Sequence, residues 1–557
     1  MDIVTKDLQT AILALFKLRT KPTVVRPDYA FGDYSTNIAF ELVKKLQQSP
    51  DDIANKLKTE LLKNPSYQSV DVVKPGFLNL RVKDTFIIKL LSRPLQTDFD
   101  NKIIVSEYSD PNPFKQLHVG HLFTSIVGDA IANLLSEVSP KVYRVNFGGD
   151  IGLHVAINIF AILKDINNDP KKLAEVDVKD RSNWLGEHYM LGHKLYKADP
   201  RVQNQVKELN KQLYSIAVKN IRDTDLAKVY WITREWSYDS FKDFYRTLKI
   251  RFDKYYPESS VAELGLQIVT NNIGKVFEKS NQAVIFDGSK HNVNTYVFID
   301  SRGLPTYSAK DVGLIFQKWQ DFKFDYSIII SGNEQSDYMN TVLKSVAQIN
   351  PELSAHTIHL TNGLVKGPSG AKFSSRLGNA PLALDLINET KEAFKQINNG
   401  SIDMNLVRAA IKYSFLKQRY SNDIIFDPKE AVSLEGKSGP YLLYAYVRGV
   451  KILNNSPFSK NILELDFDSL MFEEYDRKLA YKASEFNEVL QLAINELKPH
   501  HLANYLFDLA QIFNVFYENV KVLGSPREEL LIGLIIEYLK ILKKGLNILG
   551  IDTTTKM

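Results

Sequence analysis

The segment between residues 103 and 147 constrains the fold of this chain more than any other. Ile103–Val105 has the pattern of a short buried strand, residues 119–137 carry apolar side chains at helical spacing, and Lys141–Phe147 has the pattern of a second strand. Two strands that are joined by one helix pair in parallel, through a right-handed crossover. The segment therefore predicts an α/β domain with a doubly wound parallel sheet.

The same alternation returns later in the chain. Tyr296–Asp300, Ser327–Ser331 and Thr357–Leu360 have strand patterns, and we expect all three in the same sheet. Residues 153–282 between the two halves are mostly helical in pattern and highly charged, which indicates a helical insertion. We therefore place the α/β domain at residues 99–395.

The two ends of the chain differ from this middle part. At 557 residues the chain is too long for one core. Residues 1–98 predict a small α+β domain, in which Ser49 caps a helix and Val70–Val73 forms a hairpin with Phe77–Val82. Residues 396–557 are helical in pattern almost throughout and predict a separate α-helical domain.

Composition excludes several classes of protein and site. The chain has no cysteine, which rules out disulfides, thiolate catalysis and cysteine-built zinc or iron–sulfur sites. The net charge of +5 is mildly basic and compatible with a polyanionic partner. Apolar runs are too short for a membrane span and the first residues make a poor signal peptide, so we expect a cytoplasmic protein without a membrane partner.

The loop between the first strand and its helix carries the first chemical motif. In open parallel sheets, ligands bind beyond the carboxyl ends of the strands, where a helix N-terminus offers N–H groups to phosphate. His118 and His121 lie three residues apart on the first helical turn, and Gly120 leaves room for a nucleotide. Imidazoles at this position can stabilise the charge that develops on a phosphate during displacement.

A second motif follows about 250 residues later. Lys372, Ser374 and Ser375 follow the glycine-containing stretch 367–370 in the sequence. A loop with a cationic side chain and hydroxyl groups is suited to closing on a triphosphate and reopening for release. The order of the two motifs, with strands and helices between them, is more specific than either motif alone.

Together the motifs resemble those of class I aminoacyl-tRNA synthetases. His118-Val119-Gly120-His121 is similar to the His-Ile-Gly-His signature, and residues 372–376 to the Lys-Met-Ser-Lys-Ser loop. Ser375 stands where that loop has its second lysine. Arginyl enzymes often have such a loop together with a lysine three positions before the first signature histidine, and Lys115 occupies that position. The resemblance implies a Rossmann-type catalytic domain in which Lys115, His118, His121 and Lys372 are catalytic. ATP would contact these four residues and Gly120, Ser374 and Ser375.

Within this family, the resemblance is to the arginyl enzymes. A guanidinium substrate requires planar carboxylate acceptors. Residues that match the arginine-contacting motifs of the family, in order along the chain, are Glu107, Asn112, Tyr307, Asp311 and Gln335. Tyr307 and Asp311 are four apart at the start of a predicted helix and therefore share one face.

Both ends of the chain resemble tRNA-contacting domains of the arginyl enzymes. Phe77 and Asn79 follow a Pro-Gly turn, where an exposed ring and amide can contact an unstacked base. Tyr441, Tyr444 and Arg448 recur at helical spacing and predict a face that stacks bases and meets phosphate.

The resemblance implies the ATP-dependent attachment of L-arginine to tRNA(Arg) through an arginyl-adenylate, by a monomer that requires tRNA for activation. Mg²⁺ is expected with ATP, and no protein-bound zinc is expected.

Two alternatives to this function stay open. One is another enzyme with the same histidine motif, either a class I synthetase or a small-molecule nucleotidylyltransferase. The other is a non-catalytic tRNA-binding paralogue, which Ser375 makes conceivable.

Overall fold

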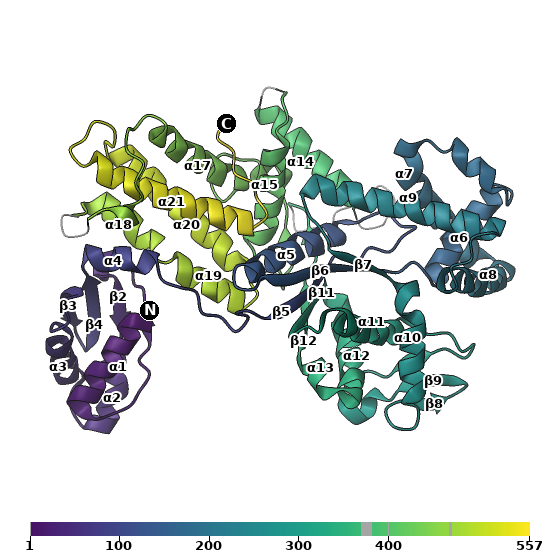
Figure 1. The fold of residues 1–557 in the computed structure, drawn as a ribbon, viewed down its shortest axis with the longest axis horizontal. Helices are drawn as coiled ribbons and strands as arrows, with labels where there is room; N and C mark the ends of the chain where they lie inside the picture. Colours follow the sequence, from purple (N-terminus) through teal and green to yellow (C-terminus); the bar gives the residue numbers. More distant parts are fainter. Residues whose placement is uncertain (1, 369–380, 399, 467–470, 557) are drawn as a thin grey trace.

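The computed structural model describes residues 2–368, 381–398, 400–466 and 471–556. Its long axis carries a small N-terminal domain at one end and a group of charged helices at the other (Figure 1). A parallel sheet lies between them, and the C-terminal helices pack beside both the sheet and the N-terminal domain (Figure 1). This arrangement confirms the predicted fold class, with an α/β centre flanked by an α+β domain and an all-α region.

The N-terminal domain is built on an antiparallel sheet with strand order β1-β2-β4-β3. The predicted hairpin is present, with Val73 opposite Phe77. The predicted helix cap is also present, since the Asp52 N–H donates to Ser49 Oγ at 3.1 Å. The elements are α1 (Asp2–Phe16), β1 (Val24–Val25), η1 (Tyr29–Phe31), β2 (Tyr34–Thr36), α2 (Ile38–Leu46), α3 (Pro50–Leu61), β3 (Tyr67–Val73), β4 (Phe77–Val82) and α4 (Asp84–Leu91).

The central domain contains a five-stranded sheet of order β12-β11-β5-β6-β7 in which every neighbouring pair is parallel. Its first strand, β5, lies in the middle, so the chain winds outward on both sides as the sequence predicts. The elements of the sheet and its helices are β5 (Ile103–Glu107), α5 (Val119–Ser136), β6 (Lys141–Gly148), β7 (Lys254–Pro257), α10 (Glu258–Asn271), α11 (Tyr307–Phe322), β11 (Tyr326–Gly332), η5 (Asn333–Gln335), α12 (Ser336–Ile349), α13 (Pro351–Ala355) and β12 (Thr357–Asn362).

One predicted strand lies elsewhere. Tyr296–Ile299 forms β10, which pairs antiparallel with β9 (Ala283–Phe286) in a separate sheet together with β8 (Glu278–Ser280). The expectation that it joins the parallel sheet is wrong. Residues 287–295 contain only the short η4 (Gly288–His291), and parallel neighbours need a crossover of about a dozen residues or more.

The range 153–282, expected to be a helical insertion, also contains β7, the edge strand of the parallel sheet. This strand has only four residues and begins with a lysine, so its pattern is too short to recognise. The helices before it share a separate apolar core that includes Ile159, Val206 and Tyr230. They are α6 (Leu153–Asp165), η2 (Pro170–Glu175), η3 (Val178–Asp180), α7 (Arg181–Ala198), α8 (Pro200–Val218) and α9 (Asp225–Leu248).

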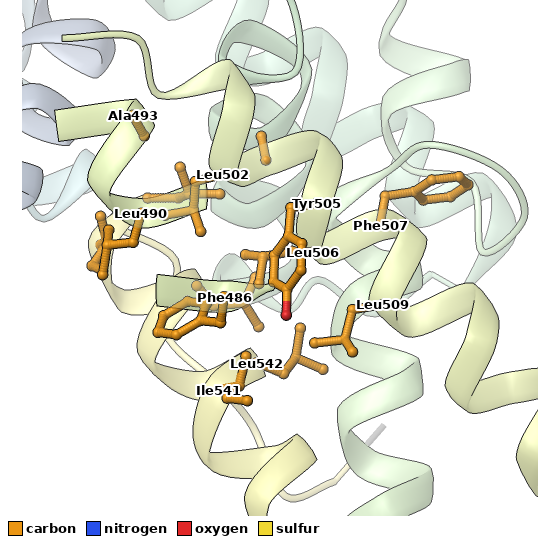
Figure 2. Packing of buried hydrophobic residues seen from close by; sticks show 14 of the residues in the cluster. Phe486, Leu490, Ala493, Leu502, Tyr505, Leu506, Phe507, Leu509, Ile541 and Leu542 are labelled. Atoms are coloured by element: carbon orange, nitrogen blue, oxygen red, sulfur yellow. The ribbon is translucent and has the colours of Figure 1, made fainter. Parts of the chain in front are cut away.

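Where the structure describes it, the C-terminal part is helical apart from two short paired strands. Phe486, Leu490, Leu506 and Leu542 come from three helices and point into one apolar cluster (Figure 2). The elements are β13 (Val365–Lys366), α14 (Ala383–Ile397), α15 (Met404–Leu416), β14 (Ile424–Ile425), α16 (Pro428–Ala431), α17 (Gly439–Leu453), η6 (Ile462–Glu464), α18 (Glu474–Ala483), α19 (Phe486–Asn495), α20 (His500–Asn519) and α21 (Glu528–Ile548).

One helix in the described part of the chain, α5, is long and apolar enough to cross a membrane. About four fifths of it, 78%, is buried inside the protein. Its apolar character is accounted for by packing against the sheet and the C-terminal helices, where Phe123 meets Phe415.

Candidate active site

The site is built where the winding of the sheet reverses. Strand β5 ends at Glu107, between β11 and β6, and the loop that follows it leads into α5. Ligands of open α/β sheets bind in the crevice at such a point, because the loops on either side of it diverge.

The loop itself is held in an unusual conformation. Ser109, Asp110 and Phe114 have φ values of 75°, 45° and 66°, a region that residues other than glycine seldom adopt. Ser109 Oγ lies 2.8 Å from the Tyr245 hydroxyl, and the Phe147 N–H donates to Asp110 Oδ1 at 2.7 Å. Such strain persists only where the surroundings enforce it, and it concentrates at functional sites.

His118 and His121 form a reciprocal cap at the start of α5. The Gly120 N–H donates to His118 Nδ1 at 3.0 Å, and the His118 N–H donates to His121 Nδ1 at 3.2 Å. In both rings Nδ1 is therefore an acceptor, which places the single proton of each neutral imidazole on Nε2. The cap thus leaves each Nε2–H available to a ligand, and the ring centroids are only 3.8 Å apart.

Both imidazoles are neutral at pH 7. Loss of solvation lowers the pKa of His118, and the ammonium of Lys115 adds to this. Burial lowers the pKa of His121 well below its usual range, with further contributions from His118 and Lys115. A side chain at Gly120 would put its Cβ 2.8 Å from His118 Cε1, so only glycine allows the His118 ring to hold the cap.

Lys115 lies half-buried in the same loop. Its Nζ is 4.9 Å from the ring centroid of Tyr189, which comes from α7 of the helical insertion. The structure therefore brings Lys115, Gly120 and the two histidines together. Lys372, Ser374 and Ser375 lie outside the described residues.

Two of the residues expected to contact arginine are held by side chains of α11 and α12. The buried ammonium of Lys318 binds Glu107, and the Tyr338 hydroxyl donates to Asp311. Burial, with the nearby Glu258 and Glu107, raises the pKa of Asp311 to about 7, against the lowering effect of the Tyr338 hydrogen bond.

Tyr307 is also placed by a hydrogen bond to a neighbouring helix. Its hydroxyl donates to His154 Nδ1 at 2.9 Å, and His154 Nε2 donates to the Gly149 carbonyl at 2.9 Å. Burial and the nearby Lys115 lower the pKa of His154 to about 3, so this histidine is a neutral relay that fixes the Tyr307 ring.

The other two expected arginine contacts lie at the ends of neighbouring strands. Asn112 Oδ1 accepts from the Gly149 N–H at 3.0 Å, which joins the loop after β5 to the loop after β6. A Cβ on Gly149 would lie 2.3 Å from that oxygen, so this turn requires glycine. Gln335 is exposed in η5, directly after β11.

Sequence reasoning missed several residues that complete this cluster. Glu258, at the start of α10, binds Lys310 of α11, and both are buried. Burial raises the pKa of Glu258, opposed by Lys310. Asp110, which shares the electrostatic environment of Glu107 and Asp311, also has a pKa raised by burial. A carboxylate and a lysine far apart in sequence give no local signal that they meet.

A fully buried carboxylate fixes the turn after β6. Asp150 accepts from Arg234 Nε at 3.0 Å, and from the N–H and hydroxyl of Ser259 at 2.9 and 2.7 Å. It thereby ties the helical insertion and the start of α10 to the sheet. Asp150 is consequently a structural neighbour of the site.

Models of known families match almost the whole chain. The catalytic domain of class I (R) tRNA synthetases matches residues 87–427, the arginyl tRNA synthetase N-terminal domain matches residues 2–82, and the DALR anticodon binding domain matches residues 442–557. The chain belongs to the arginyl-tRNA synthetases. Members of this family attach arginine to tRNA, with ATP as a substrate, so the family excludes a small-molecule nucleotidylyltransferase.

Individual relatives are similar to the chain over nearly the whole length of both sequences. The chain is 26% identical to the arginine–tRNA ligase of Flavobacterium psychrophilum, covering 100% of this chain and 99% of the relative. It is 27% identical to the arginine–tRNA ligase of Clostridium perfringens, and the match covers 96% of this chain and 95% of the relative. The arginyl-tRNA synthetase of Thermus thermophilus has the same fold, with a TM-score of 0.78, 24% identity and full coverage of both chains. The arginyl-tRNA synthetase of Plasmodium falciparum also has this fold, with a TM-score of 0.80 at 21% identity. The match covers 100% of this chain and 99% of that chain.

At the N-terminal end of this arginyl-tRNA synthetase, the two expected tRNA contacts differ in exposure. Phe77 is exposed, at 42%, and one edge of its ring packs against Phe40 at 5.2 Å between centroids. Asn79 is buried, at 9%, because its Oδ1 accepts from the Ser35 hydroxyl of the neighbouring strand at 2.8 Å. The expectation that both side chains are exposed is therefore wrong for Asn79.

In the helical C-terminal part, α17 presents the expected face. Arg448 lies over the Tyr444 ring at 4.5 Å and over Tyr517 of α20 at 5.0 Å. Asn514 joins the group, accepting from Arg448 at 3.1 Å and donating to the Tyr441 hydroxyl at 2.8 Å. All three predicted side chains are half-buried and meet on one surface.

No group of three or more histidine, aspartate or glutamate side chains suited to a metal ion occurs among residues 2–368, 381–398, 400–466 and 471–556. In this family Mg²⁺ accompanies ATP as part of the substrate.

Proposed function

We propose that this chain attaches L-arginine to tRNA(Arg) through an arginyl-adenylate, and that bound tRNA is required for the activation step. The arginine carboxylate attacks the α-phosphorus of ATP, the bond to the bridging oxygen breaks, and pyrophosphate leaves. The terminal ribose of tRNA then takes the arginyl group and AMP is released. No side chain has to act as a covalent nucleophile, so catalysis consists of positioning and charge stabilisation.

One observation carries this proposal: the cluster beside the signature histidines holds more acids than bases. The carboxyl groups come from Glu107, Asp110, Glu258 and Asp311, whereas the ammonium groups among the described residues come from Lys310 and Lys318. A guanidinium that enters this cluster brings a planar cation, which hydrogen-bonds to carboxylates in its own plane. We assign Glu107, Asn112, Tyr307, Asp311 and Gln335 to arginine.

The phosphates are assigned to the other side of the crevice. His118 and His121 each direct an Nε2–H at a ligand, and Lys115 adds a mobile positive charge. We propose that Lys115 supplies the charge that Ser375 lacks, and that Lys372, Ser374, Ser375 and Gly120 complete the ATP site. Magnesium bound to the ATP phosphates shields part of their charge.

The remaining domains are assigned to tRNA. We propose that residues 1–98 contact the outer corner of tRNA through Phe77, whereas Asn79 supports the strand beneath it through Ser35. Residues 99–395 carry catalysis, and residues 396–557 bind the anticodon through Tyr441, Tyr444 and Arg448. The grouping of these three side chains on one surface supports the last assignment.

The deciding experiment offers each of the twenty amino acids, with ATP and Mg²⁺, to the purified protein and total tRNA. We expect arginine alone to become attached, with release of AMP. Attachment of another amino acid would overturn the substrate assignment, and no attachment at all would support a non-catalytic tRNA-binding protein.

The role of Lys115 has its own test. We expect the K115A variant to consume ATP in the presence of arginine and tRNA at least tenfold more slowly than the wild type. Lys194, an exposed lysine of α7, serves as the matched control in K194A. Near-normal turnover of K115A would reject its assignment to the phosphates.

We also propose that the enzyme is a cytoplasmic monomer without membrane attachment. The burial of α5 supports this proposal, because the apolar helix already has its partners within the fold. Sedimentation at micromolar concentration and fractionation of cells test the two statements.

A further inference from the structure

One aromatic ring of the helical insertion lies against Lys115. Tyr189 lies in the middle of α7, a segment in which the sequence shows no recognisable motif. Its ring receives the Lys115 ammonium at 4.9 Å from the centroid, and both side chains are half-buried. The Tyr189 ring also packs edge to face with His193, at 4.4 Å between centroids.

Lys115 forms no ion pair with any carboxylate in the described part of the chain. Burial is the main factor that lowers the pKa of His118, His121, His154 and His193, and Lys115 contributes in each case. These rings are neutral at pH 7, so the positive charge of Lys115 stays uncompensated until an anion enters.

An aromatic face has an advantage over a carboxylate at this position. A free lysine side chain loses rotamer entropy when it is fixed on a ligand. A carboxylate partner would reduce that loss but would compete with phosphate for the ammonium. A tyrosine face attracts the ammonium without carrying a negative charge, which restrains the lysine and still releases it to a stronger anion.

We propose that Tyr189 is a positioning residue that holds Lys115 ready for the phosphates of ATP. The inference rests on the proposed function, since it requires Lys115 to act on those phosphates. Tyr189 acts through the lysine and is not itself catalytic. It gives the insertion a direct part in ATP use, and the inference depends on the ring and not on the hydroxyl, which forms no hydrogen bond with a described residue.

The test is a double-mutant cycle in the full-length enzyme with saturating tRNA and arginine. Y189L and Y189M remove the aromatic face, whereas Y189F keeps it. We expect both Y189L and Y189M to lower kcat/KM for ATP by about 3–30-fold, which corresponds to the cation–π energy. We expect Y189F to stay within about twofold of the wild type, and KM for arginine to be unchanged in all three variants.

The cycle separates positioning from a general structural role. In a K115A background, Y189L should have no further effect on kcat/KM for ATP, because the lysine through which the ring acts is gone. If Y189L lowers kcat/KM for ATP equally in the wild-type and K115A backgrounds, the inference is overturned. It is also overturned if Y189L and Y189M have wild-type kcat/KM for ATP while K115A is impaired. If K115A itself has normal activity, the proposed role of Lys115 fails first, and that result differs from a failure of Tyr189 alone. Thermal melting of each variant identifies any that is unfolded. If either Y189L or Y189M is unfolded, the other one is used for the test.

Discussion

Arg477 joins the N-terminal domain to the C-terminal helices by a two-pronged ion pair with Asp33. Its NH1 and NH2 groups donate to Asp33 Oδ1 and Oδ2 at 3.0 and 2.8 Å, and the Asp33 side chain is completely buried. The third nitrogen, Nε, donates to Asp84 at 2.9 Å. All the nitrogens of one guanidinium are therefore committed to the N-terminal domain, which fixes the two proposed tRNA-contacting regions relative to each other.

Lysine at position 477 should loosen this junction. The R477K variant keeps the charge but loses the planar fork, and we expect a loss of about 1–3 kcal/mol of unfolding free energy. KM for tRNA should rise several-fold, while KM values for ATP and arginine stay unchanged, because the junction is remote from the crevice. K478M, which alters the neighbouring surface pair with Glu474, is the matched control. A destabilised R477K with normal KM for tRNA would contradict the rigid coupling.

Asp311 should discriminate arginine from the other substrates. In D311N the amide still accepts from Tyr338, but a guanidinium bound beside it loses its ionic acceptor. We expect KM for arginine to rise by about 30–1000-fold, corresponding to about 2–4 kcal/mol for one partner of a buried charge pair. KM for ATP should change little. D337N, which alters an exposed acid at the start of α12, is the control, and equal effects in both variants would refute the assignment.

The pH dependence of arginine use should depend on the same carboxyl group. Burial raises the pKa of Asp311 to about 7, so below that pH the group is increasingly protonated and neutral. KM for arginine should therefore rise as the pH falls from 7.5 to 6 and become flat above about 8. The groups that share this environment are Glu107, Asp110, Glu258, Lys310 and Tyr338. Steady-state kinetics of D311N supply the control, and an unchanged slope in that variant would assign the dependence to another group.

Phe77 should contribute to the binding of tRNA and not to ATP use. Its exposed ring stands beside the Pro-Gly turn, and base–aromatic stacking contributes about 1–3 kcal/mol. We expect F77A to raise KM for tRNA by about 5–100-fold without changing KM for ATP. Leu62 in the same domain is similarly exposed, at 44%, so L62A controls for the loss of surface apolar area. Wild-type values for F77A would mean that the ring serves only to pack against Phe40.

The sequence predicted those features that depend on local pattern. The strands at 103–107 and 141–148, the capped helix at Ser49 and the hairpin at Phe77 all follow from spacing, turn residues or capping residues. Strand β10 was misplaced because its apolar pattern is the same in a parallel sheet and in a hairpin. Only the length of the preceding connection distinguishes the two arrangements.

The site was predictable to a similar extent. His118, His121 and Lys115 lie in one loop, so their spacing alone brings them together. Glu258 and Lys310 escaped notice because their partnership depends on how α10 packs on α11. Likewise, the burial of Asn79 depends on Ser35 of the adjacent strand, which no local pattern reveals.

Activation of arginine should be weak without tRNA. In the acidic cluster, Glu107 binds Lys318, Glu258 binds Lys310, and Asp311 accepts from Tyr338, so each of these carboxyl groups has an internal partner. Arginine has to displace or share these partners, and the binding energy of tRNA is available to favour the rearranged cluster.

We therefore expect arginine-dependent exchange of pyrophosphate into ATP to be at least tenfold slower without tRNA(Arg) than with it. A tRNA whose terminal ribose has been oxidised should restore exchange, because it binds but cannot accept arginine. Fast exchange by the enzyme alone would contradict the requirement. Failure of the oxidised tRNA to restore exchange would show that the terminal ribose itself, and not the bound body of the tRNA, assembles the site.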